Sequence, residues 1–171
     1  VRNLEAFPAV MPGVVHMRHT WLSDHRFVRG QPGSGAELAS DLQRFVDLYG
    51  ASQIAACFVE PIAGSTGVLV PPKGYLERLR QICDQSGILR VFDEVICGFG
   101  RTGHWFGSEY FGIQPDIMTL AKGITSGYIP LGAVMFNDRV SDVLRDKGGE
   151  LAHGYTYSGH PVCAAVALEN I

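Results

Sequence analysis

Four short, continuously apolar runs constrain the fold more than any other feature of this sequence. They occupy residues 54–59 (IAACFV), 88–96 (ILRVFDEVI), 117–121 (IMTLA) and 131–136 (LGAVMF). Each run has the length of a strand and lacks the alternation of apolar and polar residues that marks a half-exposed strand. Strands of this kind lie in parallel sheets whose two faces are covered by helices. The sequence therefore predicts an α/β fold of three αβα layers around a mostly parallel sheet.

Helical spacing of apolar residues appears between and after these runs. It extends over residues 36–49 and over 72–87, where a proline stands near the start and a glycine at the end. Shorter helical patterns cover 140–144 and 162–171. The proline- and glycine-rich stretches, in contrast, are predicted to be irregular, and they are residues 1–35 and 98–112.

Composition excludes several classes of protein. Of the 171 residues, 46% are hydrophobic and 18% charged, which is typical of a single globular domain. The net charge is −3 and no run of basic residues occurs, so we expect no binding to nucleic acid or to an anionic membrane. No apolar run approaches the ~20 residues that cross a bilayer. Because the four cysteines are scattered and no signal-peptide pattern is present, the sequence predicts a reducing, cytoplasmic location.

Charged side chains stand where the predicted strands end. Glu60 follows the first run, Asp93 and Glu94 lie in the second, and Lys122 follows the third. In an open parallel sheet, ligands bind at the carboxyl ends of the strands. A desolvated lysine is a nucleophile, and an acid beside it can keep a ring nitrogen protonated, as a pyridoxal phosphate site requires. A solvated lysine and a loop-capping acidic pair fit the same spacing, so spacing alone leaves both interpretations open.

Three longer segments resemble a known family. They are FVEPIAGSTGVLVPPKGYLERLRQIC (58–83), VFDEVICGFGRTGHWFGSEYFGIQPDIMTLAKGIT (91–125) and GYTYSGHPVCAA (154–165). They are similar to class III aminotransferases of the ω-amino acid:pyruvate type, and the resemblance runs from about Phe7 to Ile171. It implies the large domain of a fold-type-I, pyridoxal-phosphate-dependent enzyme. Such an enzyme moves an amino group from an amine or ω-amino acid to a keto acid such as pyruvate.

The resemblance also implies roles for single residues. Lys122, in LAKGIT, matches the lysine that holds the cofactor as a Schiff base and shuttles the substrate proton. Asp93, in FDEVICGFGR, matches the aspartate under the pyridinium nitrogen. Val95 matches the apolar residue that packs on the ring, and a strand through residue 96 would place it on the same face as Asp93. The resemblance thus implies one catalytic residue, Lys122, and two residues, Asp93 and Val95, that contact the cofactor ring.

Further matches lie at the edge of the expected site. Thr156, in GYTYSGHP, matches a threonine that reaches the phosphate of the neighbouring subunit, with the backbone of Tyr155 nearby, which implies a homodimer. Glu60 matches a glutamate at the edge of the substrate site. Ile96 stands where many relatives carry a glutamine beside the cofactor's 3′-oxygen. Since isoleucine cannot form that hydrogen bond, Ile96 favours the ω-amino acid:pyruvate branch and leaves the individual amine donor open.

The chain is expected to be part of a longer protein. It lacks an initiator methionine and stops within the apolar run 162–171. We therefore expect residues 1–171 to form part of the large cofactor-binding domain, with an N-terminal segment, the phosphate loop and the C-terminal small domain outside it. On this interpretation the chain alone does not transaminate. The alternative is a truncated, non-catalytic piece of the same fold.

Three rival sites are weaker. Residues 98–103 form a literal G-x-G-x-x-G, but the following residues are poor helix formers and no acid ends the next strand, which argues against an NAD-dependent oxidoreductase. No G-x-x-x-x-G-K-[ST] motif accompanies the acidic strand end, which argues against a P-loop ATPase. His16, His19 and His25 could bind zinc by spacing, yet histidines in an irregular segment are more often surface or packing residues. The sequence predicts no metal site.

Overall fold

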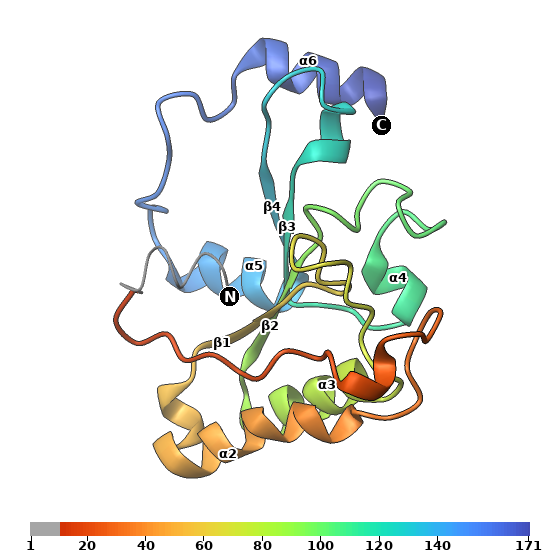
Figure 1. The fold of residues 1–171 in the computed structure, drawn as a ribbon. Helices are drawn as coiled ribbons and strands as arrows, with labels where there is room; N and C mark the ends of the chain where they lie inside the picture. Colours follow the sequence, from red (N-terminus) through yellow and green to blue (C-terminus); the bar gives the residue numbers. More distant parts are fainter. Residues whose placement is uncertain (1–10) are drawn as a thin grey trace.

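A computed structural model describes residues 11–171 as a four-stranded sheet with helices around it (Figure 1). The strands are β1 (Ala56–Val59), β2 (Leu89–Asp93), β3 (Ile117–Leu120) and β4 (Ala133–Phe136). The α-helices are α2 (Ser40–Tyr49), α3 (Tyr75–Ser86), α4 (Gly107–Phe111), α5 (Asp138–Lys147) and α6 (Pro161–Asn170). Short 3₁₀ helices complete the chain: η1 (Ser23–His25), η2 (Ala36–Ala39), η3 (Ala51–Gln53) and η4 (Lys122–Thr125).

The strands are ordered β1-β2-β3-β4, and the first three are parallel. α3 supplies the crossover from β1 to β2, and the segment that contains α4 connects β2 to β3. β3 and β4 are joined by η4 and a short turn and pair antiparallel, because parallel neighbours need a longer crossover. The prediction of a mostly parallel α/β sheet is confirmed, with β4 as the antiparallel member.

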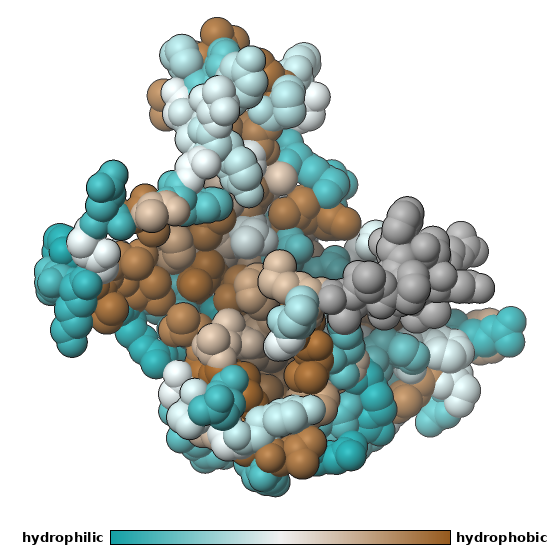
Figure 2. Space-filling view, turned by 90° about the vertical axis from the view of Figure 1, so that its left-hand side faces the viewer, coloured by the Kyte–Doolittle hydropathy of each residue, from teal (hydrophilic) through white to brown (hydrophobic). Residues whose placement is uncertain are grey.

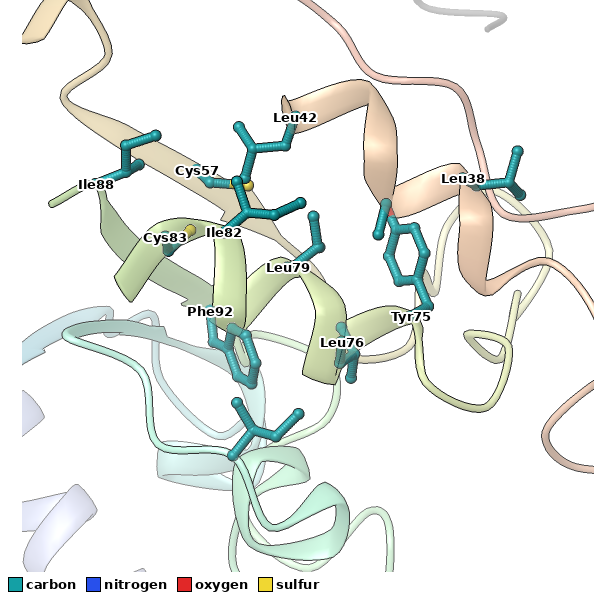
Figure 3. Packing of buried hydrophobic residues seen from close by; sticks show 12 residues of the cluster. Leu38, Leu42, Cys57, Tyr75, Leu76, Leu79, Ile82, Cys83, Ile88 and Phe92 are labelled. Atoms are coloured by element: carbon teal, nitrogen blue, oxygen red, sulfur yellow. The ribbon is translucent and has the colours of Figure 1, made fainter. Parts of the chain in front are cut away.

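The main core fills the space between the β1–β2 face and the helices α2 and α3 (Figure 3). Ile82 and Cys83 of α3 are fully buried, and Figure 3 shows them directed toward Cys57 of β1. Burying each large aliphatic side chain stabilises the fold by roughly 1.5–3 kcal/mol. Val91, which points to the opposite face of β2, is also buried. The central strand is thus covered on both faces, as its continuous apolar sequence requires.

The structure differs from the sequence-based expectations in two places. β2 ends at Asp93, so the strand predicted over 88–96 is shorter than expected. The irregular stretch predicted over 98–112 contains the five-residue helix α4. The other irregular stretch, predicted over 1–35, contains η1, and its first ten residues lie outside the described residues.

Apolar side chains also gather on the surface. In Figure 2 they form brown areas across the middle of the face, between more hydrophilic regions above and below. Phe58 of β1 is 70% exposed, although it pairs in register with the buried Val91. None of the helices in residues 11–171 is both long enough and apolar enough to cross a membrane.

Candidate functional site

The register of the parallel strands gathers three of the predicted site residues at one edge of the sheet. Val59 pairs with Phe92, so Glu60 and Asp93 come at the same level as β1 and β2 end. Asp93 pairs with Thr119, and Lys122 follows three residues later as the first residue of η4. The carboxyl ends of adjacent parallel strands form the ligand-binding edge of an open α/β sheet. Glu60, Asp93 and Lys122 therefore lie at the edge where a ligand site is expected.

The Asp93 side chain ends its own strand. Its Oδ1 atom accepts a hydrogen bond from the backbone N–H of Val95 at 3.0 Å, an arrangement that folds the chain into a turn. Val95 is consequently outside β2, and the expectation that it shares a strand face with Asp93 is wrong. Within residues 11–171 no hydrogen bond reaches the Oδ2 atom of Asp93, which leaves this oxygen able to bind a cationic partner.

Lys122 has an unusual backbone conformation. Its φ is +46°, in the left-handed region that side-chain-bearing residues avoid and that costs of order 1–3 kcal/mol. The neighbouring Gly123 packs against Phe99, which also has a positive φ, of 57°. A Cβ atom on Gly123 would come within 2.9 Å of the Cβ of Phe99, so only glycine fits there. The strained Phe99 thus packs against the glycine that directly follows the strained, exposed Lys122.

Glu94, next to Asp93, is completely buried. Its carboxylate accepts hydrogen bonds from the backbone N–H groups of Gly107, at 2.8 Å, and Ser108, at 2.6 Å, where α4 begins. Burial raises the pKa of Glu94, although these two N–H donors oppose that shift. The side chain ties the loop after β2 to α4 and explains why a helix starts in this glycine- and aromatic-rich stretch. The sequence placed Glu94 at the end of a strand but gave no signal of this burial or of its link to α4.

Glu60 and Ile96 lie on either side of one glycine. The Oε2 atom of Glu60 accepts the backbone N–H of Gly64 at 2.9 Å. The side chain of Ile96 packs so closely on Gly64 that a Cβ there would lie within 2.4 Å of the Ile96 Cδ1 atom. Both residues therefore shape the loop after β1 at the edge of the site.

Tyr155 and Thr156 lie in the exposed chain between α5 and α6. The Tyr155 backbone N–H donates to Ser158 Oγ at 2.9 Å, and the Tyr155 side chain is 77% exposed. Within residues 11–171 no hydrogen bond or ion pair joins either residue to Asp93 or Lys122. The structure does not bring these two residues into the same set of contacts as the sheet edge.

Two of the hollows in the described part of the chain are lined by neither Asp93 nor Lys122. The larger, about 1080 Å³, runs along β1 beside residues 13–20 and includes Glu60. The larger hollow therefore reaches the edge of the site at Glu60 without including Asp93 or Lys122.

The rival sites gain no support from the geometry. No helix begins within residues 98–103, because α4 starts at Gly107, so the turn of a dinucleotide site is not formed. His25 uses both ring nitrogens on backbone groups, Nδ1 with the Leu22 N–H and Nε2 with the Ser34 carbonyl. Among the residues that the structure describes, no three His, Cys, Asp or Glu side chains are arranged to hold a metal ion.

The chemistry available at the sheet edge is that of an amine and a carboxylate from neighbouring strands. Lys122 supplies a primary amine, and Asp93 supplies an anion with one free oxygen. An amine can bond covalently to a carbonyl group, and an anion stabilises a protonated ring nitrogen. The arrangement can therefore hold a ligand that carries both groups.

The chain is similar to known proteins over nearly its whole length. Residues 6–171 match the family model described as aminotransferase class-III. The chain is 51% identical to an omega-aminotransferase of Caulobacter vibrioides and 49% identical to an omega-amino acid–pyruvate aminotransferase of Pseudomonas putida. These matches cover 99% and 97% of this chain, but only 40% and 38% of those proteins. The chain thus spans about two fifths of the length of these curated relatives.

Solved structures give the same result for the fold. The omega transaminase from Pseudomonas jessenii in complex with PMP superposes with a TM-score of 0.88 at 43% identity. An (S)-enantioselective omega-transaminase from Thermomicrobium roseum gives a TM-score of 0.87, also at 43% identity. Each match covers 99% of this chain and 38% of the other. The predicted fold-type-I architecture is therefore confirmed.

Proposed function

Because the chain belongs to the class-III aminotransferase family, we propose that the whole protein moves an amino group from an amine or ω-amino acid to a keto acid such as pyruvate. The observation that carries this proposal is the placement of Asp93 and Lys122 at the ends of adjacent parallel strands. The names of the relatives support the choice of acceptor, since these proteins include omega-amino acid–pyruvate, β-alanine–pyruvate and putrescine–pyruvate aminotransferases.

The residues at the sheet edge fit pyridoxal phosphate as the cofactor. When bound, pyridoxal phosphate supplies a carbonyl carbon that bonds to amines and a ring that accepts electrons from the substrate carbon. The Asp93 Oδ2 atom, free of hydrogen bonds in residues 11–171, can pair with the protonated ring nitrogen. The Lys122 amine, on the exposed side of η4, can reach a ligand lying on this edge.

Lys122 and Asp93 then have separate tasks. Lys122 would hold the cofactor through its amine and would move the proton at the reacting carbon of the substrate. Asp93 keeps the ring nitrogen protonated through a charge-assisted hydrogen bond. Val95 and Ile96, in the turn after Asp93, provide apolar contacts beside the ring, and neither side chain can donate a hydrogen bond to it.

The remaining residues concern the rim and the second subunit. Glu60 lies at the substrate edge, where its carboxylate is engaged by Gly64. We assign Thr156 and the backbone of Tyr155 to the phosphate of a neighbouring subunit, so that the enzyme is a homodimer. Their exposure, and the lack of contacts to Lys122 within residues 11–171, support a role outside their own sheet edge.

The test is an amine-donor screen on the whole protein. β-Alanine, a diamine and an aromatic amine are each supplied with pyruvate and pyridoxal phosphate, and alanine is measured. We expect alanine from at least one donor, and we expect Lys122→Ala to lower the rate by at least about 10²-fold, as loss of a positioned proton-transfer group does. The control is Lys147→Ala, at the exposed end of α5, which should keep the wild-type rate. No alanine from any donor, or full activity in Lys122→Ala, would contradict the proposal.

A further inference from the structure

Asn170, the last residue of α6, forms hydrogen bonds to the turn that carries Lys122. Its Nδ2 atom donates to the backbone carbonyls of Gly123, at 2.9 Å, and Ile124, at 3.2 Å. Its Oδ1 atom accepts a hydrogen bond from the Ser126 hydroxyl. Figure 1 shows α6 lying beside the turn after β3, although the two segments are more than 40 residues apart in the chain. One side chain therefore makes three hydrogen bonds to η4 and the residue that follows it.

The turn needs such support because its backbone is strained at both ends. Lys122 has a φ of +46° and Ser126 a φ of +50°, and neither is glycine. Conformations of this kind persist only where the surrounding structure holds them. The turn's own backbone hydrogen bonds include those from Ser126 N to Gly123 O and from Gly127 N to Lys122 O, each at 3.1 Å.

Asn170 also satisfies a carbonyl group at a helix end. The last carbonyls of any helix lack partners within the helix, and in so short a helix as η4 this applies to most of them. The Asn170 amide supplies an N–H to Ile124 O and a second contact to Gly123 O. An apolar side chain of similar size would fill the space without giving these donors.

We propose that Asn170 is a positioning residue for Lys122. Through its amide it holds the turn in the conformation that presents the Lys122 amine at the sheet edge. The significance of that placement rests on the proposed function, whereas the holding of the turn is independent of it. The experiment below measures the two separately.

The first measurement follows the turn in the whole protein without cofactor. Amide hydrogen exchange of Ser126 and Gly127 is compared among wild type, Asn170→Leu, Asn170→Asp and the control Glu169→Gln, an exposed neighbour on the same helix. We expect protection of these two amides to fall by about tenfold in both Asn170 variants, since each loses two donated hydrogen bonds. Glu169→Gln should match wild type, and amides of β2 should be unchanged in all four proteins.

The pH dependence separates hydrogen bonding from space filling. In Asn170→Asp the new carboxylate faces carbonyl oxygens, which favour the protonated form and raise the carboxyl pKa above its usual value of about 3.9. As the pH falls, the protonated carboxyl becomes a donor, and part of the lost protection should return in Asn170→Asp but not in Asn170→Leu. The other titratable groups on η4 and α6 are Lys122, Cys163 and Glu169, and all three are identical in these two variants.

The second measurement uses the whole protein loaded with pyridoxal phosphate. The visible absorbance of the Lys122-bound cofactor is titrated with pH, and the midpoint is compared among the same proteins. A tenfold change in how often the turn holds Lys122 in place should move that midpoint by up to about one pH unit, because the held turn favours one protonation state of the bound amine over the other. A purely structural role for Asn170 would lower thermal stability and leave this midpoint unchanged.

Several outcomes would overturn the proposal. Wild-type protection in Asn170→Leu would show that the donated hydrogen bonds are not needed, as would identical pH profiles for the Leu and Asp variants. If both variants fail to fold by circular dichroism, Ser126→Ala takes their place, because it removes one of the three contacts. It should lower protection of Gly127 by about threefold, and no loss would contradict the proposal. A wild-type protein that transfers no amino group would refute the proposed function, while the exchange data would still decide the role of Asn170.

Discussion

Asp93 lies directly opposite Thr119 in the parallel pair of β2 and β3, and the next backbone N–H, that of Glu94, donates to the Thr119 carbonyl at 2.9 Å. This pairing fixes how far Asp93 stands from the start of the turn that carries Lys122. A slip of one residue would turn Asp93 to the other face of the sheet. The register of these two strands is thus the physical basis of the candidate site.

Asp93→Asn should lower the aminotransfer rate of the whole protein by at least about 10²-fold, while leaving the fold intact. The asparagine oxygen can still accept the Val95 N–H, so the turn after β2 survives. The lost charge no longer holds a ring nitrogen protonated. The rate is measured with pyruvate and the best donor, with Asp146→Asn, an exposed change on α5, as control. Equal rates for both variants would remove Asp93 from the site.

Thr156→Ala and Lys122→Ala should complement each other when both subunits are co-expressed. If Thr156 serves the neighbouring subunit, each mixed dimer contains one site with both residues intact. A purified mixed dimer should then have roughly half of wild-type activity, because one of its two sites is intact. Activity is measured on purified dimers that carry two affinity tags. A mixed dimer no more active than Thr156→Ala alone would place Thr156 in its own subunit's site.

Glu94→Ala should destabilise the protein by about 3 kcal/mol, because it leaves the buried N–H groups of Gly107 and Ser108 without an acceptor.

The stability difference between wild type and Glu94→Gln should also depend on pH. Burial raises its pKa in the folded state, so its contribution to stability is complete below the unfolded pKa. The advantage of wild type over Glu94→Gln should therefore shrink as the pH rises above about 4.3. Urea unfolding across pH 4–8 measures this difference in free energy of unfolding, with Glu150→Gln as the exposed control. A difference that grows as the pH rises would contradict the prediction.

Asp116 should show the opposite pH dependence. It is 2% exposed and accepts hydrogen bonds from Arg90 N (2.8 Å), Asn137 Nδ2 (3.1 Å) and Arg139 NH1 (3.4 Å), which tie β2, β3 and the start of α5 together. Burial works against the charged form, but the Arg90 N–H, the Asn137 amide and the Arg90 charge together hold the pKa of Asp116 below its usual value.

Asp116→Ala should cost about 3–5 kcal/mol, the typical effect of removing one partner from a buried ion pair. Because the folded-state pKa is lowered, the stability that Asp116 provides is present above about pH 3.9 and is lost as the pH falls below it. The difference between wild type and Asp116→Asn should consequently narrow on acidification. Urea midpoints between pH 3 and 7 test this against Asp138→Asn, and a constant difference would show that the carboxylate charge is not involved.

Much of this fold could be predicted from local patterns, because the four apolar runs contain all four strands and the helical patterns contain or overlap α2, α3, α5 and α6. The site was harder to predict from the sequence. The sequence indicated that Asp93 and Lys122 end neighbouring strands, since strand ends are local features. It could not show that Asp93 captures the Val95 N–H and stops the strand early, which overturned the expected position of Val95.

The contacts that support the site join residues distant in the chain. Glu94 accepts hydrogen bonds from residues 13 and 14 positions later, and Asn170 reaches back 47 positions to Gly123. No spacing rule links such pairs, because their approach depends on how whole elements pack. The positive φ of Lys122 is equally hidden, since a lysine before a glycine gives no signal of a left-handed backbone.

The order of the sheet has a consequence for handling this segment in the laboratory. Within residues 11–171, β1 and β4 each pair with one neighbour, so the outer backbone groups of both strands are open. Side chains on them, such as Phe58 and Met135, are more than half exposed. Unprotected apolar edges of this kind are templates for aggregation. Residues 1–171 produced alone should therefore need a solubility partner. We also expect the β-sheet content of this segment to rise as it is concentrated, because β1 and β4 of different copies can pair.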